Sequence, residues 1–185
     1  MTPDDRRQAL VDVTIPLLHQ HGRSVTTKQI ADAAGVAEGT LFRVFDSKED
    51  LVDAAVMQAL DMESFLVDLE SVDLDQDLRS RMIDLCARLQ DRFRDIFLLM
   101  SAMGMVGPPK SHQHMEDDRH RAVKVMVTVV EADAEELTCT PVQLVHMLRM
   151  LTFSGTHPHI SDGHILTPGQ IVGTLLDGVL KRKDS

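Results

Sequence analysis

The 185-residue sequence contains no tryptophan and no tyrosine, and it has only two cysteines, Cys86 and Cys139. Two cysteines cannot build the disulfide framework of a small secreted domain, and they favour a reducing compartment. No apolar run approaches the roughly 20 residues that a membrane-spanning helix needs. Residues 1–10 carry acids where a secretory signal peptide carries bases. These absences predict a cytoplasmic protein.

Residues 24–50 contain three helix signals that lie too close together for anything but a compact helix-turn-helix. Thr26 and Gln29 form a T-x-x-Q capping box, in which each residue satisfies an unpaired N–H group at the start of a helix. Gly35 then ends this helix, as a glycine in the left-handed conformation commonly does. The predicted starts of the three helices are Thr27, Glu38 and Lys48.

The second of these short helices presents two different faces. Gly39, Thr40 and Arg43 share one face at spacings of three and four residues. A glycine lets the backbone approach a groove, a threonine can bond a phosphate or meet a thymine methyl, and an arginine can form two hydrogen bonds with guanine. The opposite, apolar face comprises Leu41, Val44 and Phe45.

The pattern TTKQIADAAGV followed by GTLFRVFDSKEDL resembles the DNA-binding head of the tetracycline repressor (TetR) family of bacterial transcription regulators. The resemblance covers about the first quarter of the chain. It implies an all-helical homodimer in which a small N-terminal head binds a palindromic operator, while a larger C-terminal domain dimerises and holds an effector. The family's usual phosphate-binding tyrosine is Phe42 here, its common serine is Ala37 and its frequent histidine is Val44. Without these polar groups, the basic side chains of the head carry more of the affinity.

The predicted DNA-binding residues are Thr27, Lys28, Gly39, Thr40, Phe42, Arg43 and Lys48. The net charge of −10 is unusual for a DNA-binding protein, and residues 1–50 hold six basic and eight acidic residues. The bases must therefore cluster on the DNA side, and the affinity should fall steeply with salt. The alternative is that residues 24–50 form a buried helical hairpin whose charges are merely solvated.

The sequence predicts an all-α fold with an N-terminal three-helix helix-turn-helix head, residues 1–47, and a C-terminal helical effector-binding and dimerisation domain, residues 48–185. The first helix spans residues 2–21, and a long helix from Lys48 to about Leu69 links the two domains. Further helices are expected over residues 78–103, as two helices with a break near Asp91, and over residues 113–136. Two more begin at the capping boxes of Thr140 and Thr167.

These last two helices are more apolar than one small core requires, which predicts that they bury a second side against another chain in a two-fold four-helix interface. The alternative is a terminal hairpin that packs only within its own subunit. The predicted dimer-interface residues are Val145, Arg149, Ile171, Val172, Leu175, Leu176 and Val179.

Methionine is abundant in the second domain, and such adaptable side chains suit an apolar ligand of variable shape. Methionines at helical spacing are also ordinary core residues, so both readings stay open. The predicted ligand-binding residues are Met62, Phe65, Met82, Cys86, Leu89, Phe93, Phe97, Met126, Met147 and Met150.

Neither catalysis nor a metal or cofactor is expected. The histidines gather in two groups near loops without the spacing of a strong metal site; these groups are His112, His114 and His120, and His157, His159 and His164 with Asp162. The sequence therefore predicts a one-component transcriptional repressor that a small apolar effector releases from its operator. The alternatives are an all-helical small-molecule carrier or enzyme that does not bind an operator, and a protein-binding adaptor.

Overall fold

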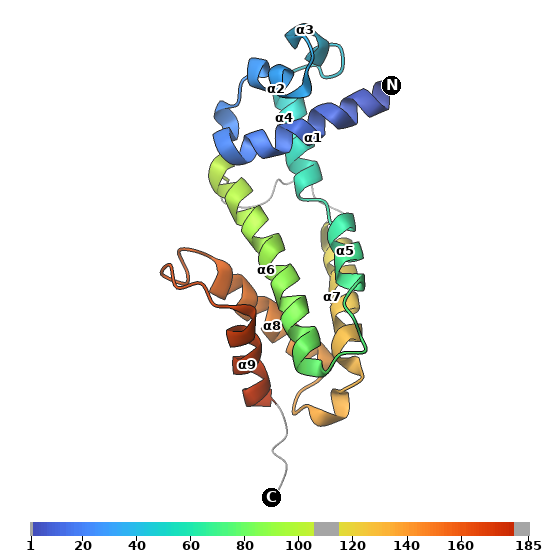
Figure 1. Cartoon of the computed structure of the whole chain (residues 1–185), viewed down its shortest axis with the longest axis vertical. Coiled ribbons are helices and arrows are strands. Elements are labelled where there is room, and N and C mark those ends of the chain that lie inside the picture. Colours follow the sequence, from blue (N-terminus) through green and yellow to red (C-terminus); the bar gives the residue numbers. More distant parts are fainter. Residues whose placement is uncertain (1, 106–114, 180–185) are drawn as a thin grey trace, which may run out of the picture. The chain divides into compact units, whose positions relative to one another are not determined.

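The computed structural model describes residues 2–105 and 115–179, and every regular element in these residues is a helix (Figure 1). The all-α prediction is therefore confirmed. The chain forms two compact units: the first contains residues 2–61 and 96–105, and the second contains residues 62–95 and 115–179. The functional boundary after residue 47 stays a prediction. None of the described helices has the length and apolar composition that crossing a membrane requires.

The first unit begins with four helices, and capping residues correctly predicted the starts of three of them. The Thr2 hydroxyl accepts a hydrogen bond from the Asp5 N–H at 3.1 Å, and the Asp5 carboxylate accepts one from the Thr2 N–H at 2.7 Å. Gly35 ends the second helix with φ of +65° in the left-handed region, as expected. The four helices are α1 (Pro3–His21), α2 (Thr27–Ala34), α3 (Glu38–Leu41) and α4 (Lys48–Ala59).

The end of α1 packs closely against the last turn of a later helix, α6 (Leu78–Met103), within the same unit. After α1 the short 3-10 helix η1 (Gly22–Ser24) follows, and a Cβ atom at Gly22 would lie only 1.9 Å from the Ala102 carbonyl oxygen. Arg23 Nε also donates a hydrogen bond to the Met103 carbonyl oxygen at 3.1 Å. These contacts join two segments that lie far apart in the sequence.

The single long helix predicted from Lys48 to about Leu69 is wrong, because α4 ends at Ala59 and a separate helix, α5 (Glu63–Glu70), follows. Leu60 belongs to the core of the first unit, whereas Phe65 belongs to the core of the second. A straight helix continues one apolar stripe in one direction. The change of core between Leu60 and Phe65 accounts for the turn at this point.

The break predicted near Asp91 is also wrong, because α6 is one helix of 26 residues, about 39 Å long at ~1.5 Å per residue. It contains no proline or glycine, and Arg94 pairs with Asp91 at 2.6 Å across the expected break. Its first part supplies Met82 and Leu85 to one core, and its last part supplies Leu99 to the other. The change in the apolar pattern therefore marks a change of core along a continuous helix.

The second unit packs α5 and the first part of α6 with three further helices (Figure 1). Gln143 and Gln170 each close the capping box of the helix that contains them, as predicted. Arg81, only 5% exposed, pairs with the Asp133 carboxylate in the loop after α7. The further helices are α7 (Met115–Glu131), α8 (Pro141–Thr156) and α9 (Pro168–Val179), with the 3-10 helix η2 (Ala134–Glu136) between α7 and α8.

Candidate nucleic-acid interface

The turn between α2 and α3 holds α3 with one side in the core of the first unit. The N–H groups of Gly35 and Val36 donate back to carbonyl oxygens of α2 at 3.2 and 3.0 Å. Leu41 and Phe45 are buried, and Val44 is half-buried. Because α3 ends at Leu41, Arg43, Val44 and Phe45 lie after this helix and not on it as the sequence predicted. The residues predicted to face inward are still buried or half-buried, and Gly39 and Arg43 are exposed.

Three of the predicted DNA-binding residues, Lys28, Gly39 and Arg43, are exposed and make no side-chain contact with another described residue that would occupy them. Gly39 is exposed, and a Cβ atom there would meet no atom within 4 Å, so the surface above it is open. The exposed side chains of Arg43 and Lys28 form no ion pair or side-chain hydrogen bond with another described residue. Both cations therefore remain available for phosphates or bases. Thr40 beside them is half-buried.

The other predicted contacts are placed differently. The Thr27 hydroxyl donates a hydrogen bond to the Glu38 carboxylate and so connects the starts of α2 and α3. Lys48 Nζ donates to the Val25 carbonyl oxygen at 3.3 Å, which ties the start of α4 to the segment before α2. Phe42 is 53% exposed and offers an apolar surface where the resemblance implied a tyrosine hydroxyl.

Two features of this surface were missed by the sequence analysis. Glu38 was predicted only as a helix start, although the first residues of the second helix of such a motif are the ones that reach base edges. The Arg7 guanidinium carbon lies 4.2 Å from the centroid of the Phe45 ring, a cation–π contact that joins α1 to the residues after α3. No spacing rule in the sequence pairs residues that far apart.

Five of the seven residues predicted for the dimer interface lie in the interior of their own unit, so this part of the prediction is wrong. The apolar residues of α9 that are described belong to a core to which α5, α6, α7 and α8 also contribute. That core is larger than the sequence pattern suggested. Arg149 is half-buried, and the Val179 side chain lies outside the described residues. The five buried residues are Val145, Ile171, Val172, Leu175 and Leu176.

The predicted ligand-binding residues are mostly packed against one another. Phe97 lies on the part of α6 that belongs to the first unit, and Met150 is 56% exposed, so neither lines an interior site with the others. Partly buried members at the edge of the core are Met62, Phe93 and Met147. The members inside the core are Phe65, Met82, Cys86, Leu89 and Met126.

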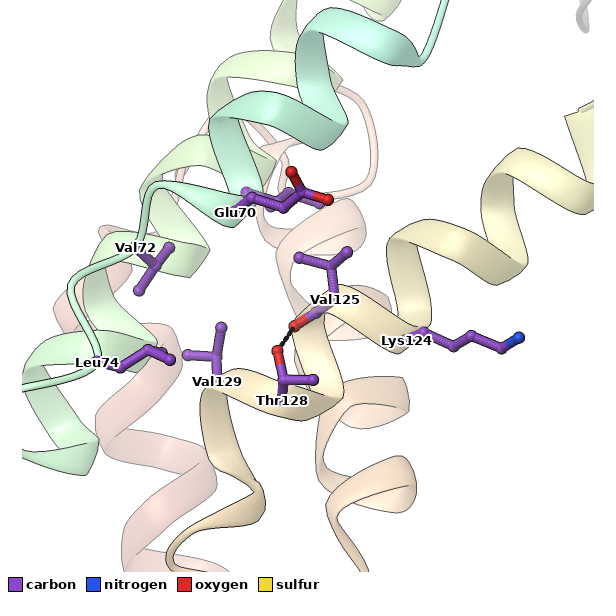
Figure 2. Close-up of a pocket in the computed structure, with 8 residues that line it drawn as sticks. Glu70, Val72, Leu74, Lys124, Val125, Thr128 and Val129 are labelled. Atoms are coloured by element: carbon purple, nitrogen blue, oxygen red, sulfur yellow. Dashed lines mark hydrogen bonds between the residues drawn. The ribbon is translucent and has the colours of Figure 1, made fainter.

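Two open hollows lie on the described surface of the second unit. One, of about 330 Å³, lies between the α5–α6 loop and α7, where Leu74 and Val129 point toward each other and Lys124 points away (Figure 2). The Thr128 hydroxyl there donates to the Val125 carbonyl oxygen at 2.7 Å. The other, of about 640 Å³, lies at the start of α8 and includes Met147, the one predicted ligand residue among the described residues that line either hollow.

Burial governs the titration of two side chains in this unit. Burial raises the pKa of the Cys86 thiol above its ordinary value, although a contact with the Thr152 hydroxyl at 3.4 Å partly opposes this. Burial also lowers the pKa of Arg149, and the charge of nearby Arg119 acts in the same direction. Among the described residues, no three His, Cys, Asp or Glu side chains are placed to hold a metal, and two of the histidines considered, His112 and His114, lie outside them.

The head of the chain is thus a capped helix-turn-helix with an exposed polar face, and a separate helical unit follows it. Residues 10–55 match the family described as bacterial regulatory proteins, tetR family. The HTH-type transcriptional repressor KstR2 of Rhodococcus jostii is 44% identical over 57 residues, which are 30% of this chain and 28% of KstR2. The regulator YvkB of Bacillus subtilis is 37% identical over 79 residues, 42% of this chain and 41% of YvkB. The matched regions thus span less than half the length of these curated relatives.

Solved structures show the same fold over almost the whole chain. A TetR transcription regulator from Haloarcula marismortui superposes with a TM-score of 0.64 at 17% identity, over 96% of this chain and 100% of that one. The ketosteroid transcriptional regulator KstR2 of Mycobacterium tuberculosis superposes with a TM-score of 0.55 at 21% identity, over 96% of each chain. Residues 10–55 therefore carry the helix-turn-helix region of the tetR family, and almost the whole chain has the fold of these regulators.

Proposed function

We propose that this protein is a one-component transcriptional regulator, a repressor that binds a pseudo-palindromic operator as a homodimer and leaves it when a small apolar effector binds the second unit. The exposed side of α3 and of the turn after it carries this proposal, because Arg43 forms no ion pair or side-chain hydrogen bond with another described residue and Gly39 is open, while Leu41 and Phe45 are anchored in the core. The relative KstR2 of Rhodococcus jostii, of which the match covers 28%, is named as a repressor. A regulator of bacterial genes acts in the cytoplasm.

The electrostatic requirement on such a head is strict, because the chain carries a net charge of −10. Each phosphate that a cation neutralises contributes a slope of about −0.9 to the dependence of log K on log salt. Lys28 and Arg43 are free to neutralise phosphates or bind bases, while the acidic remainder of the chain repels the duplex elsewhere. Binding should therefore be specific in orientation and strongly weakened by salt.

Selection of duplexes from a random pool tests the proposal, since a symmetric dimer must enrich a palindrome with half-sites one helical turn, ~34 Å, apart. Arg43→Ala should weaken binding to the selected duplex by roughly 5- to 150-fold, the cost of losing a contact of about 1–3 kcal/mol. Arg94→Ala is the matched control, because Arg94 is also an exposed arginine but lies on α6 in the second unit. A protein that enriches no sequence and forms no salt-sensitive complex would be a carrier, an enzyme or an adaptor instead.

In this proposal the two subunits contact each other through an exposed stripe on α8, and not through the buried residues predicted from the sequence. Val142 is 58% exposed, Met150 is 56% exposed and Phe153 is 38% exposed, and with His146 they recur at helical spacing along one side. A palindromic operator requires a second copy of this chain, and a stripe of this kind suits a two-fold helix–helix contact. Light scattering of Met150→Glu should show a monomer. Val67→Glu, at an exposed apolar position on α5, should leave the dimer intact.

In this proposal the effector binds in the methionine-rich core between α6, α7 and α8. Its adaptable side chains allow it to open around an apolar molecule. A solved structure of similar fold, with a TM-score of 0.60 at 16% identity, is that of a SmeT–triclosan complex. Because α6 supplies residues to both cores, a ligand that shifts its first part also acts on its last part. A ligand at 100 times its dissociation constant should stabilise the protein by about 2.7 kcal/mol, and the same ligand should release the selected duplex.

A further inference from the structure

We propose that Glu38 reads a base, a cytosine in each half of the operator, and that Thr27 holds its carboxylate in position. This inference rests on the proposed function and adds a specificity-determining residue to it. Glu38 is the first residue of α3, it is exposed, and its carboxylate accepts a hydrogen bond from the Thr27 hydroxyl.

Glu38 stands at the start of α3, where side chains can contact the edges of bases. In helix-turn-helix proteins the N-terminal residues of the second helix enter the major groove and contact the bases. Leu41 at the end of α3 and Phe45 after it are both buried, so the helix cannot rotate to hide its first turn. Gly39 next to it is open and allows the backbone to approach the groove. The Glu38 carboxylate therefore lies at the leading edge of the predicted DNA-binding face.

Affinity does not explain a carboxylate at this place, and stability explains it only in part, because an acid in the first turn of a short, exposed helix interacts modestly with the helix dipole. A negative charge on a surface that approaches phosphates weakens binding to every sequence. The hydrogen bond between Thr27 and Glu38 joins two groups at the surface, where such contacts add little to stability. The benefit that remains is discrimination between bases, which a charged acceptor provides strongly because it is repelled by the wrong edges.

The chemistry of a carboxylate selects cytosine. Guanine presents two acceptors in the major groove and thymine presents one, so an acceptor such as Glu38 is repelled by both. Adenine presents its N6 donor beside the N7 acceptor, which opposes an approaching carboxylate. Cytosine presents its N4 amino group alone as a donor, and Glu or Asp accepts from it. A single acceptor group at the start of α3 therefore favours cytosine over the other three bases.

Thr27 is a positioning residue in this arrangement. An exposed glutamate loses rotamer freedom when it binds a base, and that entropy is a cost of recognition. The bond from the Thr27 hydroxyl engages one carboxylate oxygen before DNA arrives and leaves the other oxygen as a free acceptor. The hydroxyl of Thr27, which the sequence predicted as a direct DNA contact, thus acts through Glu38.

Duplex selection from a random pool, performed with the full-length protein and three variants, tests the inference. Glu38→Gln should change the selected base from cytosine to adenine, because an amide pairs with adenine N6 and N7 through one acceptor and one donor, and the ratio of the two preferences should move by roughly 10-fold or more. Thr27→Val should keep cytosine but reduce its enrichment several-fold. Glu49→Gln removes the same charge from the exposed first turn of α4 and should leave the selected bases unchanged.

Two results would overturn the inference while leaving the regulator intact. The first is a Glu38→Gln variant that selects the same palindrome as the unaltered protein. The second is a variant that binds every duplex more tightly by the same factor, since Glu38 would then act by charge alone. A pool from which none of the proteins enriches a palindrome would instead reject the proposed function, and the base-reading role with it. Circular dichroism of each variant shows whether the head is folded.

Discussion

Replacing Gly22 with alanine should destabilise the first unit by an amount that the structure allows to be worked out. Gly22 adopts φ of +53° and ψ of −138° at the end of α1. A backbone with such a positive φ costs an L-residue on the order of 1–2 kcal/mol. The added Cβ atom would also lie 1.9 Å from the Ala102 carbonyl oxygen, more than 1 Å inside the 3.0 Å below which real Cβ contacts are essentially absent. Overpacking of this kind typically costs about 1–3 kcal/mol, so the sum is about 2–5 kcal/mol.

The measurement is thermal unfolding followed by far-ultraviolet circular dichroism, with Gly35→Ala as the matched control. Gly35 lies in the left-handed region with φ of +65°, and a Cβ atom there meets nothing within 4 Å, so the control carries the cost of a positive φ without the clash. For a chain of this size 1 kcal/mol lowers the midpoint by about 2–4 °C. Gly22→Ala should therefore melt roughly 4–20 °C lower than the unaltered protein, and Gly35→Ala about 2–8 °C lower. Equal shifts for the two variants would show that the end of α1 does not pack on the last turn of α6.

Three further predictions concern the second unit. Asp133→Ala leaves the guanidinium of Arg81, 5% exposed, without its carboxylate, and urea unfolding should show a loss of about 3–5 kcal/mol. Asp77→Ala should lower the melting temperature at neutral pH, because hydrogen bonds from Ser80 at the start of α6 hold the pKa of this carboxyl below its usual range. The stabilisation by Asp77 exists above the ordinary pKa of about 3.9 and is lost as the pH falls through the lowered value, so the two proteins should converge in strong acid. Burial raises the pKa of the Cys86 thiol, so iodoacetamide at neutral pH should label half-buried Cys139 and spare Cys86 until the protein unfolds, as mass spectrometry of the peptides would show.

Local signals in the sequence predicted where the helices of the candidate site begin. The capping residues Thr26, Ser47 and Thr140 each mark a helix start within one residue, because a cap is satisfied by N–H groups two or three positions away. The glycine turn after α2 is equally local. Together with the spacing of apolar residues on and after α3, these signals are enough to place Gly39 and Arg43 on the exposed side.

The tertiary structure decided how the apolar residues divide between the two cores. A stripe at helical spacing shows that a side chain is buried, but it does not show against which element. For this reason the sequence pattern wrongly predicted one helix in place of α4 and α5, and two helices in place of α6. It also predicted that Ile171 and Val172 contact a second chain, although they are buried within their own subunit.

The sequence by itself thus determined the helical class, most helix starts and the exposed side of α3, since these depend on residues within one or two turns of each other. The folded chain alone decided the bond from Thr27 to Glu38, the contact of Gly22 with Ala102 and the continuity of α6. Each of these depends on which distant segments meet, and that is set by the packing of whole helices around a shared core.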